Sequence, residues 1–205
     1  MAPKEQRVPR DCGFFCNTPI GYVSAVDELT ELARAAQAGD RLALGAFIRK
    51  AQNPVRQFCH RLVDRERADD LTQEVFVRAW QGLGGFRFES RALSWVMGIA
   101  YKVCSEQRRR DRRQELLHGR LGNRKQVQRP DHGEQIALEN LIDELPRDQR
   151  AAVVLTQMLG FTYAEAAEVC ETETGTIRSR VARARARLLQ VLQEDDAAPS
   201  LRRDG

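Results

Sequence analysis

Residues 68–80 read ADDLTQEVFVRAW, and this stretch predicts an amphipathic helix. Its apolar side chains recur every three or four positions, which places them on one face of an α-helix. The expected buried stripe consists of Leu71, Val75, Ala79 and Leu83, widened by Phe76 and Trp80. Glycines at positions 82, 84 and 85 follow directly and are expected to end the helix.

The other side of this predicted helix is acidic. One helical turn separates Asp69 from Gln73 and Asp70 from Glu74, so these side chains should form an exposed ridge. Like carboxylates at this spacing repel each other mildly, so an isolated domain gains no stability from them. Three interpretations remain open: a divalent-metal site of a nucleic-acid enzyme, a docking surface for a basic protein, or an ordinary solvated face.

Apolar residues on both sides of this stretch continue the helical rhythm. The upstream stripe consists of Leu44, Phe47, Ile48, Ala51, Val55, Phe58 and Leu62. Pro54 is expected to kink that helix or to restart it after Asn53. The downstream stripe consists of Leu93, Val96, Met97, Ala100 and Cys104. Together they predict a compact helical domain over residues 26–112, preceded by a disordered leader at residues 1–25.

A second helical domain is predicted for residues 134–193. Pro146 fits the first position of one helix, and Gly160 should stop it. Thr162 and Glu165 have the spacing of a capping box, which predicts a short helix after them. A long helix from about Thr174 follows, with apolar residues on one side. Its other side carries Arg178, Arg180, Arg183, Arg185 and Arg187, with no acidic residue among them.

A short helix and a long basic helix joined by a tight turn are typical of a helix-turn-helix DNA-binding unit. The alternative is a solvated basic helix without a partner, although such a surface usually has acidic residues at pairing distance. Residues 113–133 contain glycine, proline and basic residues and predict a flexible linker, and residues 194–205 predict a disordered tail. The expected fold is therefore all-α, with two small helical domains.

Charge and cysteine content limit the class of protein further. The 205 residues include 33 Lys and Arg against 29 Asp and Glu, so a polyanionic partner must be argued from where charge gathers. Positive charge gathers on the long helix predicted from about Thr174. A second cluster consists of Arg108, Arg109, Arg110, Arg112 and Arg113. Five scattered cysteines do not form a secreted disulfide framework, and Cys104 and Cys170 fit apolar faces. Cys12 and Cys16 lack further ligands, so no metal or other cofactor is expected.

No apolar run approaches the roughly 20 residues that span a bilayer, and no secretory signal opens the chain. A cytoplasmic protein without membrane insertion is expected.

A loop with aromatic and basic residues lies between the stripe that ends at Leu83 and the stripe that starts at Leu93. Residues 85–91 read GFRFESR and are followed by Trp95. Aromatic and arginine side chains on a loop suit the binding of unstacked bases. Alternatively, Phe86, Phe88 and Trp95 plug the core.

In this order, these stretches resemble the extracytoplasmic-function (ECF) sigma factors, subunits that give bacterial RNA polymerase its promoter specificity. The most specific motifs are DDLTQE at residues 69–74 and GTIRSR at residues 175–180, supported by Leu145-Pro146 and Arg183-Ala184-Arg185. The resemblance covers nearly all of residues 26–193, with the actinobacterial SigC group nearest. It implies a non-enzymatic initiation factor with a sigma2-like helical bundle and a sigma4-like helix-turn-helix domain.

The resemblance also implies roles for particular residues. The implied contacts with the beta-prime clamp helices of core polymerase are Asp69, Asp70, Gln73 and Glu74, supported by Leu71 and Phe76. The implied minus-10 residues, which capture a flipped base and assist melting, are Phe86, Arg87, Phe88, Glu89, Ser90, Trp95, Arg108, Arg109 and Arg112. The implied minus-35 residues are Thr174, Thr176, Arg178, Ser179, Arg180 and Arg183. The beta flap of the polymerase and an anti-sigma factor are further implied partners.

One feature departs from the family pattern. Glu171 and Glu173 stand in the turn before the last helix, where small or apolar residues are usual. Carboxylates there suit the helix dipole but repel phosphate. Two rivals to the sigma-factor interpretation remain: a stand-alone helix-turn-helix regulator, and a metal-dependent nucleic-acid enzyme using Asp69, Asp70 and Glu74.

Overall fold

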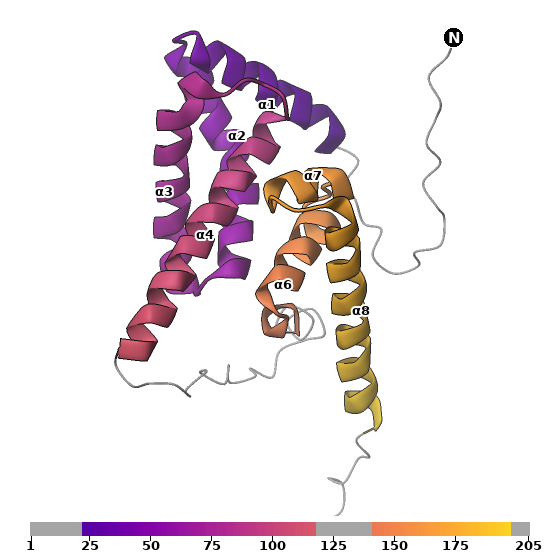
Figure 1. Cartoon of the computed structure of the whole chain (residues 1–205). Coiled ribbons are helices and arrows are strands. Elements are labelled where there is room, and N and C mark those ends of the chain that lie inside the picture. Colours follow the sequence, from indigo (N-terminus) through magenta and orange to yellow (C-terminus); the bar gives the residue numbers. More distant parts are fainter. Residues whose placement is uncertain (1–21, 118–140, 198–205) are drawn as a thin grey trace, which may run out of the picture.

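The computed structural model describes residues 22–117 and 141–197, and the elements in those two ranges are all helical. The first unit comprises α1 (Tyr22–Gln37), α2 (Arg41–Leu62), α3 (Arg65–Gly82), the 3₁₀ turn η1 (Leu83–Gly85) and α4 (Ala92–Leu117). The second comprises α6 (Arg147–Val153), the π-helical turn η2 (Val154–Met158), α7 (Tyr163–Val169) and α8 (Thr174–Ala197). The all-α fold with two helical domains is confirmed (Figure 1).

The first unit is held by the predicted stripes, with two differences. Helix α2 is capped at its N-terminus by Asp40, whose side chain accepts hydrogen bonds from the amides of Leu42 and Ala43. It runs unbroken through Pro54, so the predicted restart after Asn53 does not occur. Pro54 itself is buried, and packing of the surrounding apolar residues offsets its missing hydrogen bond. Trp80 does not widen the buried stripe of α3, because 62% of it is exposed.

Element ends differ from the predicted domain limits by a few residues. Helix α1 starts at Tyr22, within the expected leader, and α4 continues to Leu117, into the expected linker. Helix α8 continues to Ala197, past the predicted end of the last helix. Most of the expected leader, linker and tail, together with Cys12 and Cys16, lies outside the described residues.

Local sequence chemistry predicts most of the helix ends in the second unit. Pro146 is an exception, because it is the N-cap of α6, which begins at Arg147, and not the predicted first helical position. Gly160 has a φ of 72°, a left-handed conformation that glycine adopts readily and that stops the preceding helix. The Thr162 side chain accepts from the Glu165 amide, and the Glu165 carboxylate accepts from the Thr162 amide, so the predicted capping box is confirmed. The π-helical turn at Val154–Met158 was not predicted.

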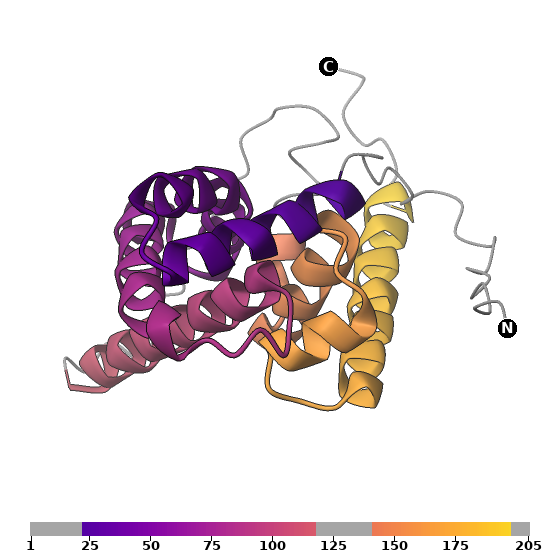
Figure 2. The same cartoon turned by 90° about the horizontal axis from the view of Figure 1, so that it is seen from above.

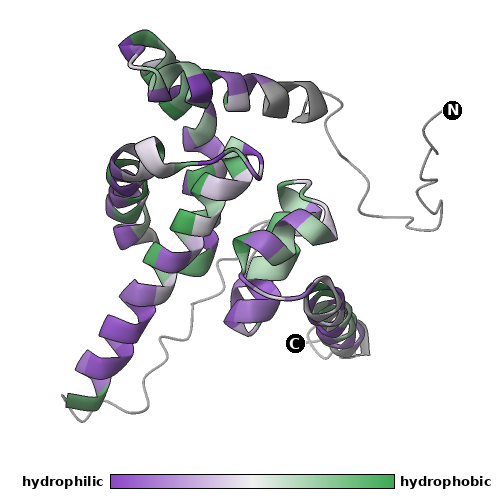
Figure 3. Cartoon of the chain, turned by 45° about the horizontal axis from the view of Figure 1, so that its top comes forward, coloured by the Kyte–Doolittle hydropathy of each residue, from purple (hydrophilic) through white to green (hydrophobic). Residues whose placement is uncertain are grey.

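The two units pack directly against each other. Figures 1 and 2 show α6, α7 and α8 along the side of α4 that faces away from α3. Helix α4 contacts α7, and α2 contacts α6. Buried residues of both units, from Leu29 to Ala184, belong to one hydrophobic cluster. The far half of α4 projects beyond this packing and is mostly hydrophilic (Figure 3). Within the described ranges, none of the helices is long and apolar enough to cross a membrane.

Candidate functional site

The solvent side of α3 combines polar and large apolar side chains. Asp70 and Gln73 are exposed, and among the described residues none is hydrogen-bonded or ion-paired to either of them. Val77 and Trp80 follow at helical spacing and are 52% and 62% exposed. Because these positions recur every three or four residues, they share one stripe. We define Asp70, Gln73, Glu74, Val77 and Trp80 as the α3 face.

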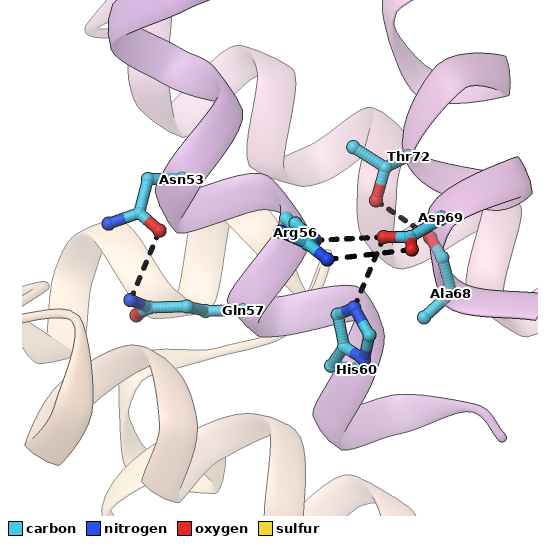
Figure 4. A network of polar contacts seen from close by, with 7 residues as sticks. All are labelled: Asn53, Arg56, Gln57, His60, Ala68, Asp69 and Thr72. Atoms are coloured by element: carbon cyan, nitrogen blue, oxygen red, sulfur yellow. Dashed lines mark hydrogen bonds and ion pairs between the residues drawn. The ribbon is translucent and has the colours of Figure 1, made fainter. Parts of the chain in front are cut away.

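Asp69 borders the α3 face but is engaged within the unit. Its carboxylate accepts a hydrogen bond from Arg56 Nε at 2.8 Å and lies 3.2 Å from His60 Nε2, both on α2 (Figure 4). The hydrogen bond from Arg56, and then that from His60, lowers the pKa of Asp69 below its ordinary value. Nearby, Thr72 Oγ1 donates to the Ala68 carbonyl at 2.7 Å. Asp69 therefore ties α3 to α2.

Glu74 is also balanced by a cation. Arg78 Nη2 lies 2.6 Å from the Glu74 carboxylate and 2.8 Å from that of Glu106 on α4. The hydrogen bond from Arg78 lowers the pKa of Glu106. Sequence reasoning treated the carboxylates of α3 as uncompensated, but Arg56 and Arg78 compensate two of them. Arg78 could have been found from its i,i+4 spacing to Glu74, whereas Arg56 had no local signal.

The carboxylates do not converge on a common point. Among the described residues, the structure contains no group of three or more His, Cys, Asp or Glu side chains that could hold a metal ion. Leu71 is buried beneath the α3 face, and Phe76 is half-buried against the core. These two residues therefore support α3 from inside, while Asp70, Gln73 and Trp80 are presented to solvent.

The loop between η1 and α4 is built on an aromatic stack. Phe86 is only 8% exposed, and its ring stacks on Trp95 at 4.6 Å between centroids. Phe88 packs against Phe86 at 4.5 Å, and the Arg34 guanidinium lies 4.3 Å from the Phe88 ring. Phe86 and Trp95 therefore anchor the loop in the core. Arg87 and Glu89 are exposed, and Ser90 is half-buried.

The backbone of this loop is held in a strained conformation. Phe88 has a φ of 58°, in the left-handed region that aromatic residues rarely occupy. The side-chain amide of Gln37 donates 2.8 Å hydrogen bonds to the carbonyls of Leu83 and Phe86. Such strain persists only where surrounding contacts hold it, and it is frequent at functional sites. Gln37 and Arg34 were not singled out from the sequence, because their partners are about 50 residues away.

A cavity of about 450 Å³ separates this loop from the second unit. Phe88, Glu89, Ser90 and Arg91 line one side, and Glu165 and Glu168 of α7 line the other. Arg91 and Glu165, which both line the cavity, form an ion pair at 2.9 Å. The depression is largely open to solvent. The loop is therefore accessible, with α7 placed across it.

The two arginine clusters have different surroundings. Arg109 and Arg112 are exposed on the projecting half of α4, and Arg108 is half-buried. On α8, Thr174, Arg178 and Arg183 are exposed, whereas Thr176 and Ser179 are half-buried. Arg180 does have an acidic partner: its Nη2 lies 3.3 Å from Asp148 of α6. The absence of acidic residues among the arginines of α8 therefore did not show that these arginines are unpaired.

Polar contacts join the two units at three further places. Arg150 donates to the Arg61 carbonyl at 2.9 Å, and Arg61 lies 3.6 Å from Asp143. Arg147 donates to Ser105 Oγ at 2.7 Å, with its guanidinium 5.6 Å from the centre of the Tyr101 ring. Burial lowers the pKa of Arg147 from its ordinary value. On the surface, Lys102 lies 2.5 Å from Glu171, one of the two glutamates before α8.

Comparison with known families matches both units. Residues 47–114 match Sigma-70 region 2, and residues 135–188 match Sigma-70 region 4. These two regions together define a sigma factor, the class of initiation factor that directs RNA polymerase to promoters. The ECF RNA polymerase sigma factor SigC of Mycobacterium tuberculosis is 40% identical over 182 residues, covering 83% of this chain and 94% of SigC. The ECF sigma factor SigM of the same species is 33% identical over 199 residues, covering 90% of this chain and 98% of SigM.

The chain therefore belongs to the ECF family of RNA polymerase sigma factors, and it is similar to the SigC group. Solved structures agree with this assignment. The sigma factor RpoE in complex with the anti-sigma factor NepR, from Bartonella quintana, has a TM-score of 0.63 and 27% identity, covering 71% of this chain and 94% of RpoE. CnrH in complex with the cytosolic domain of CnrY also has a TM-score of 0.63, with 25% identity, covering 82% of this chain and 99% of CnrH.

Proposed function

We propose that this sigma factor docks on core RNA polymerase through the α3 face and contacts promoter DNA through the other candidate residues. The minus-10 contacts would come from the loop at residues 86–91 and from Arg108, Arg109 and Arg112. The minus-35 contacts would come from Thr174, Thr176, Arg178, Ser179 and Arg183. Arg180 would act mainly by holding α8 against α6 through Asp148.

One observation supports the docking site above all: Trp80 and Val77 are exposed beside an unpaired carboxylate, Asp70. Exposed large apolar residues next to polar ones are typical of protein interfaces, where tryptophan is a frequent hot spot. A divalent metal does not explain exposed Trp80, and a solvated acidic face does not either. A basic protein surface with an apolar centre explains Asp70, Trp80 and Val77 together.

The loop supports base capture by exposed polar groups around an anchored aromatic stack. Because Phe86 is covered by Phe88 and Trp95, it would position the loop rather than stack on a base. Arg87, Glu89 and Ser90 present hydrogen-bonding groups that suit the edge of an unpaired base. The exposed arginines of α4 would neutralise the neighbouring phosphates, which positions the strand without reading its sequence.

The packing of the two units supports weak DNA binding by the free chain. Helix α7 lies across the cavity from the loop, and Arg91 at the end of the loop is paired with Glu165. A promoter DNA strand would therefore have to displace α7 before it could bind around the loop at residues 86–91. Core polymerase would offset this cost by binding both units. RpoE and CnrH were each solved with another protein bound, and we propose an anti-sigma factor as a candidate partner here as well.

The decisive experiment measures promoter binding with and without core polymerase. We expect weak gel shifts for the free chain, strong shifts for the holoenzyme, and run-off transcripts only when both components are present. Tight duplex binding by the free chain would instead support a stand-alone helix-turn-helix regulator. Magnesium-dependent cleavage that disappears in Asp70→Asn would support the nucleic-acid enzyme.

A charge reversal tests the docking site separately. We expect Asp70→Arg to weaken binding to core polymerase by about a hundredfold, because it places a cation against a basic partner surface. Glu115→Arg, a matched reversal at an exposed position of α4, should leave core binding unchanged. Equal effects of the two variants would contradict the proposed site.

We also propose that the chain has no catalytic site of its own, since bond formation belongs to the polymerase. We propose that it acts in the cytoplasm, together with the polymerase.

A further inference from the structure

Two cysteines meet in the core of the first unit. Cys59 on α2 and Cys104 on α4 are both fully buried, and their sulfur atoms lie 3.7 Å apart. A disulfide needs a sulfur separation of about 2.05 Å, so the two atoms must approach each other by less than 2 Å. The pair lies 45 positions apart in the sequence, and no spacing rule predicts the contact. Neither cysteine takes part in the proposed contacts with polymerase or DNA.

The two thiols are not equivalent. The Cys104 thiol donates a hydrogen bond to the sulfur of Cys59. This hydrogen bond lowers the pKa of Cys59, while it raises the pKa of Cys104 together with burial. A thiolate is the form that attacks an oxidant, and a hydrogen bond stabilises that form at Cys59. The geometry therefore gives Cys59 the role of nucleophile and leaves Cys104 as the second thiol.

We propose that Cys59 and Cys104 are an oxidation site at which a peroxide forms an intramolecular disulfide between α2 and α4. The Cys59 thiolate attacks one peroxide oxygen, the O–O bond breaks, and Cys59 becomes a sulfenic acid while hydroxide leaves and takes a proton. The Cys104 thiol then attacks the Cys59 sulfur, and the sulfenic oxygen leaves as water. In total, two thiols and one peroxide give one disulfide and two waters.

Burial sets the rate of this reaction rather than its outcome. Both sulfurs are shielded, so a peroxide molecule must enter during brief local opening of α2 against α4. Once the sulfenic acid forms, the second thiol is already in contact with it, which favours the disulfide over further oxidation. We therefore expect slow oxidation that ends cleanly in the linked form.

The disulfide would join α2 and α4, which contact each other and both contact α3. It would close a long loop in the unfolded chain and so stabilise the unit that carries the α3 face. We expect the midpoint of thermal unfolding to rise by roughly 5 °C on oxidation and to return on reduction.

The full chain with Cys12→Ser and Cys16→Ser is the right protein for the test, because it retains the three described cysteines. After treatment with hydrogen peroxide, free thiols are labelled under denaturing conditions and the peptides are analysed by mass spectrometry. We expect a linked Cys59–Cys104 peptide and full labelling of Cys170. Cys170 is a matched internal control, since it is buried and burial raises the pKa of its thiol to about 12.

A second variant separates the two chemical steps. Cys104→Ser keeps a hydrogen-bond donor beside Cys59 but cannot form the disulfide, so the sulfenic acid on Cys59 should accumulate and react with dimedone. Cys59→Ser should give no dimedone adduct on Cys104. The proposal would be overturned if the chain with Cys12→Ser and Cys16→Ser gave no linked Cys59–Cys104 peptide, or if Cys170 were oxidised as fast as that pair. Neither outcome depends on whether the chain binds polymerase.

Discussion

The α3 face and the outer side of α8 are both exposed surfaces of amphipathic helices, but they have opposite chemistry. The α3 face places Trp80 and Val77 beside one unpaired carboxylate, Asp70. The outer side of α8 presents Thr174, Arg178 and Arg183. Exposed apolar area strengthens binding only when a partner surface removes it from water. Arginines strengthen binding because they release the counterions of a polyanion.

This difference shows that two exposed helix faces within one chain can be assigned to different partners. A protein interface concentrates its free energy in a few buried anchors, so a single truncation should be costly. A phosphate-binding surface spreads its free energy over several similar contacts that depend on salt. The variants below separate the two surfaces by size of effect and by salt dependence.

Among single truncations, the largest effect is expected for Trp80→Ala. Loss of an interface tryptophan of the hot-spot kind weakens binding by about 2 kcal/mol, or roughly thirtyfold. Affinity for core polymerase can be measured by titration of fluorescently labelled chain. Because Trp80 is exposed, the stability of the free chain should barely change, which thermal unfolding checks. Unchanged core affinity would place the interface elsewhere.

A smaller effect is expected for Arg178→Ala and Arg183→Ala. Each should weaken holoenzyme binding to a promoter by about tenfold and reduce the salt dependence of binding by about one phosphate contact. Promoter affinity measured over a range of salt concentrations gives both quantities. Neither variant should change affinity for core polymerase. A loss of affinity without a change in salt slope would argue against phosphate contact.

Arg180→Ala should separate a structural arginine from the DNA-facing ones. Arg180 is 19% exposed and paired with Asp148, so its loss should cost about 1 kcal/mol of stability, or a fall of roughly 3 °C in the unfolding midpoint. Arg178→Ala is the matched control and should leave the midpoint unchanged. If Arg180→Ala instead keeps full stability and lowers the salt slope, Arg180 belongs with the DNA contacts.

The smallest effect is expected from the titration of Asp69. Its pKa is lowered in the folded chain, so the ionised carboxylate stabilises the fold above its unfolded pKa of about 3.9. That contribution is lost as the pH falls through the lowered folded value. The difference in unfolding midpoint between the wild-type chain and Asp69→Asn should therefore be present at about pH 7 and shrink toward about pH 3. A difference that is constant with pH would contradict the pairing with Arg56.

Local patterns in the sequence predicted most of the helices. The three-and-four spacing of apolar residues located α2, α3 and the start of α4, because a helix must bury one continuous stripe. The Thr162 and Glu165 capping box predicted the start of α7, since both of its hydrogen bonds lie within one turn. Buried positions for Cys104 and Cys170 also followed from these stripes and are confirmed.

Errors arose where one residue could occupy either of two environments. Trp80 fits the edge of the apolar stripe by spacing, yet 62% of it is exposed to solvent. Arg180 lacks a partner within its own helix but finds Asp148, 32 positions away. In both cases the local pattern allowed two outcomes, and for Arg180 a neighbouring helix, α6, supplied the partner that decided between them.

The sequence by itself determined the helical class and the helix ends at capping residues, because each depends on contacts within a few turns of chain. Its motifs also identified the two regions of an ECF sigma factor. Only the tertiary structure decided which carboxylates are already neutralised, how α7 lies across the loop and which two cysteines touch. These features depend on side chains tens of residues apart, and they arise only when the helices pack around a common core.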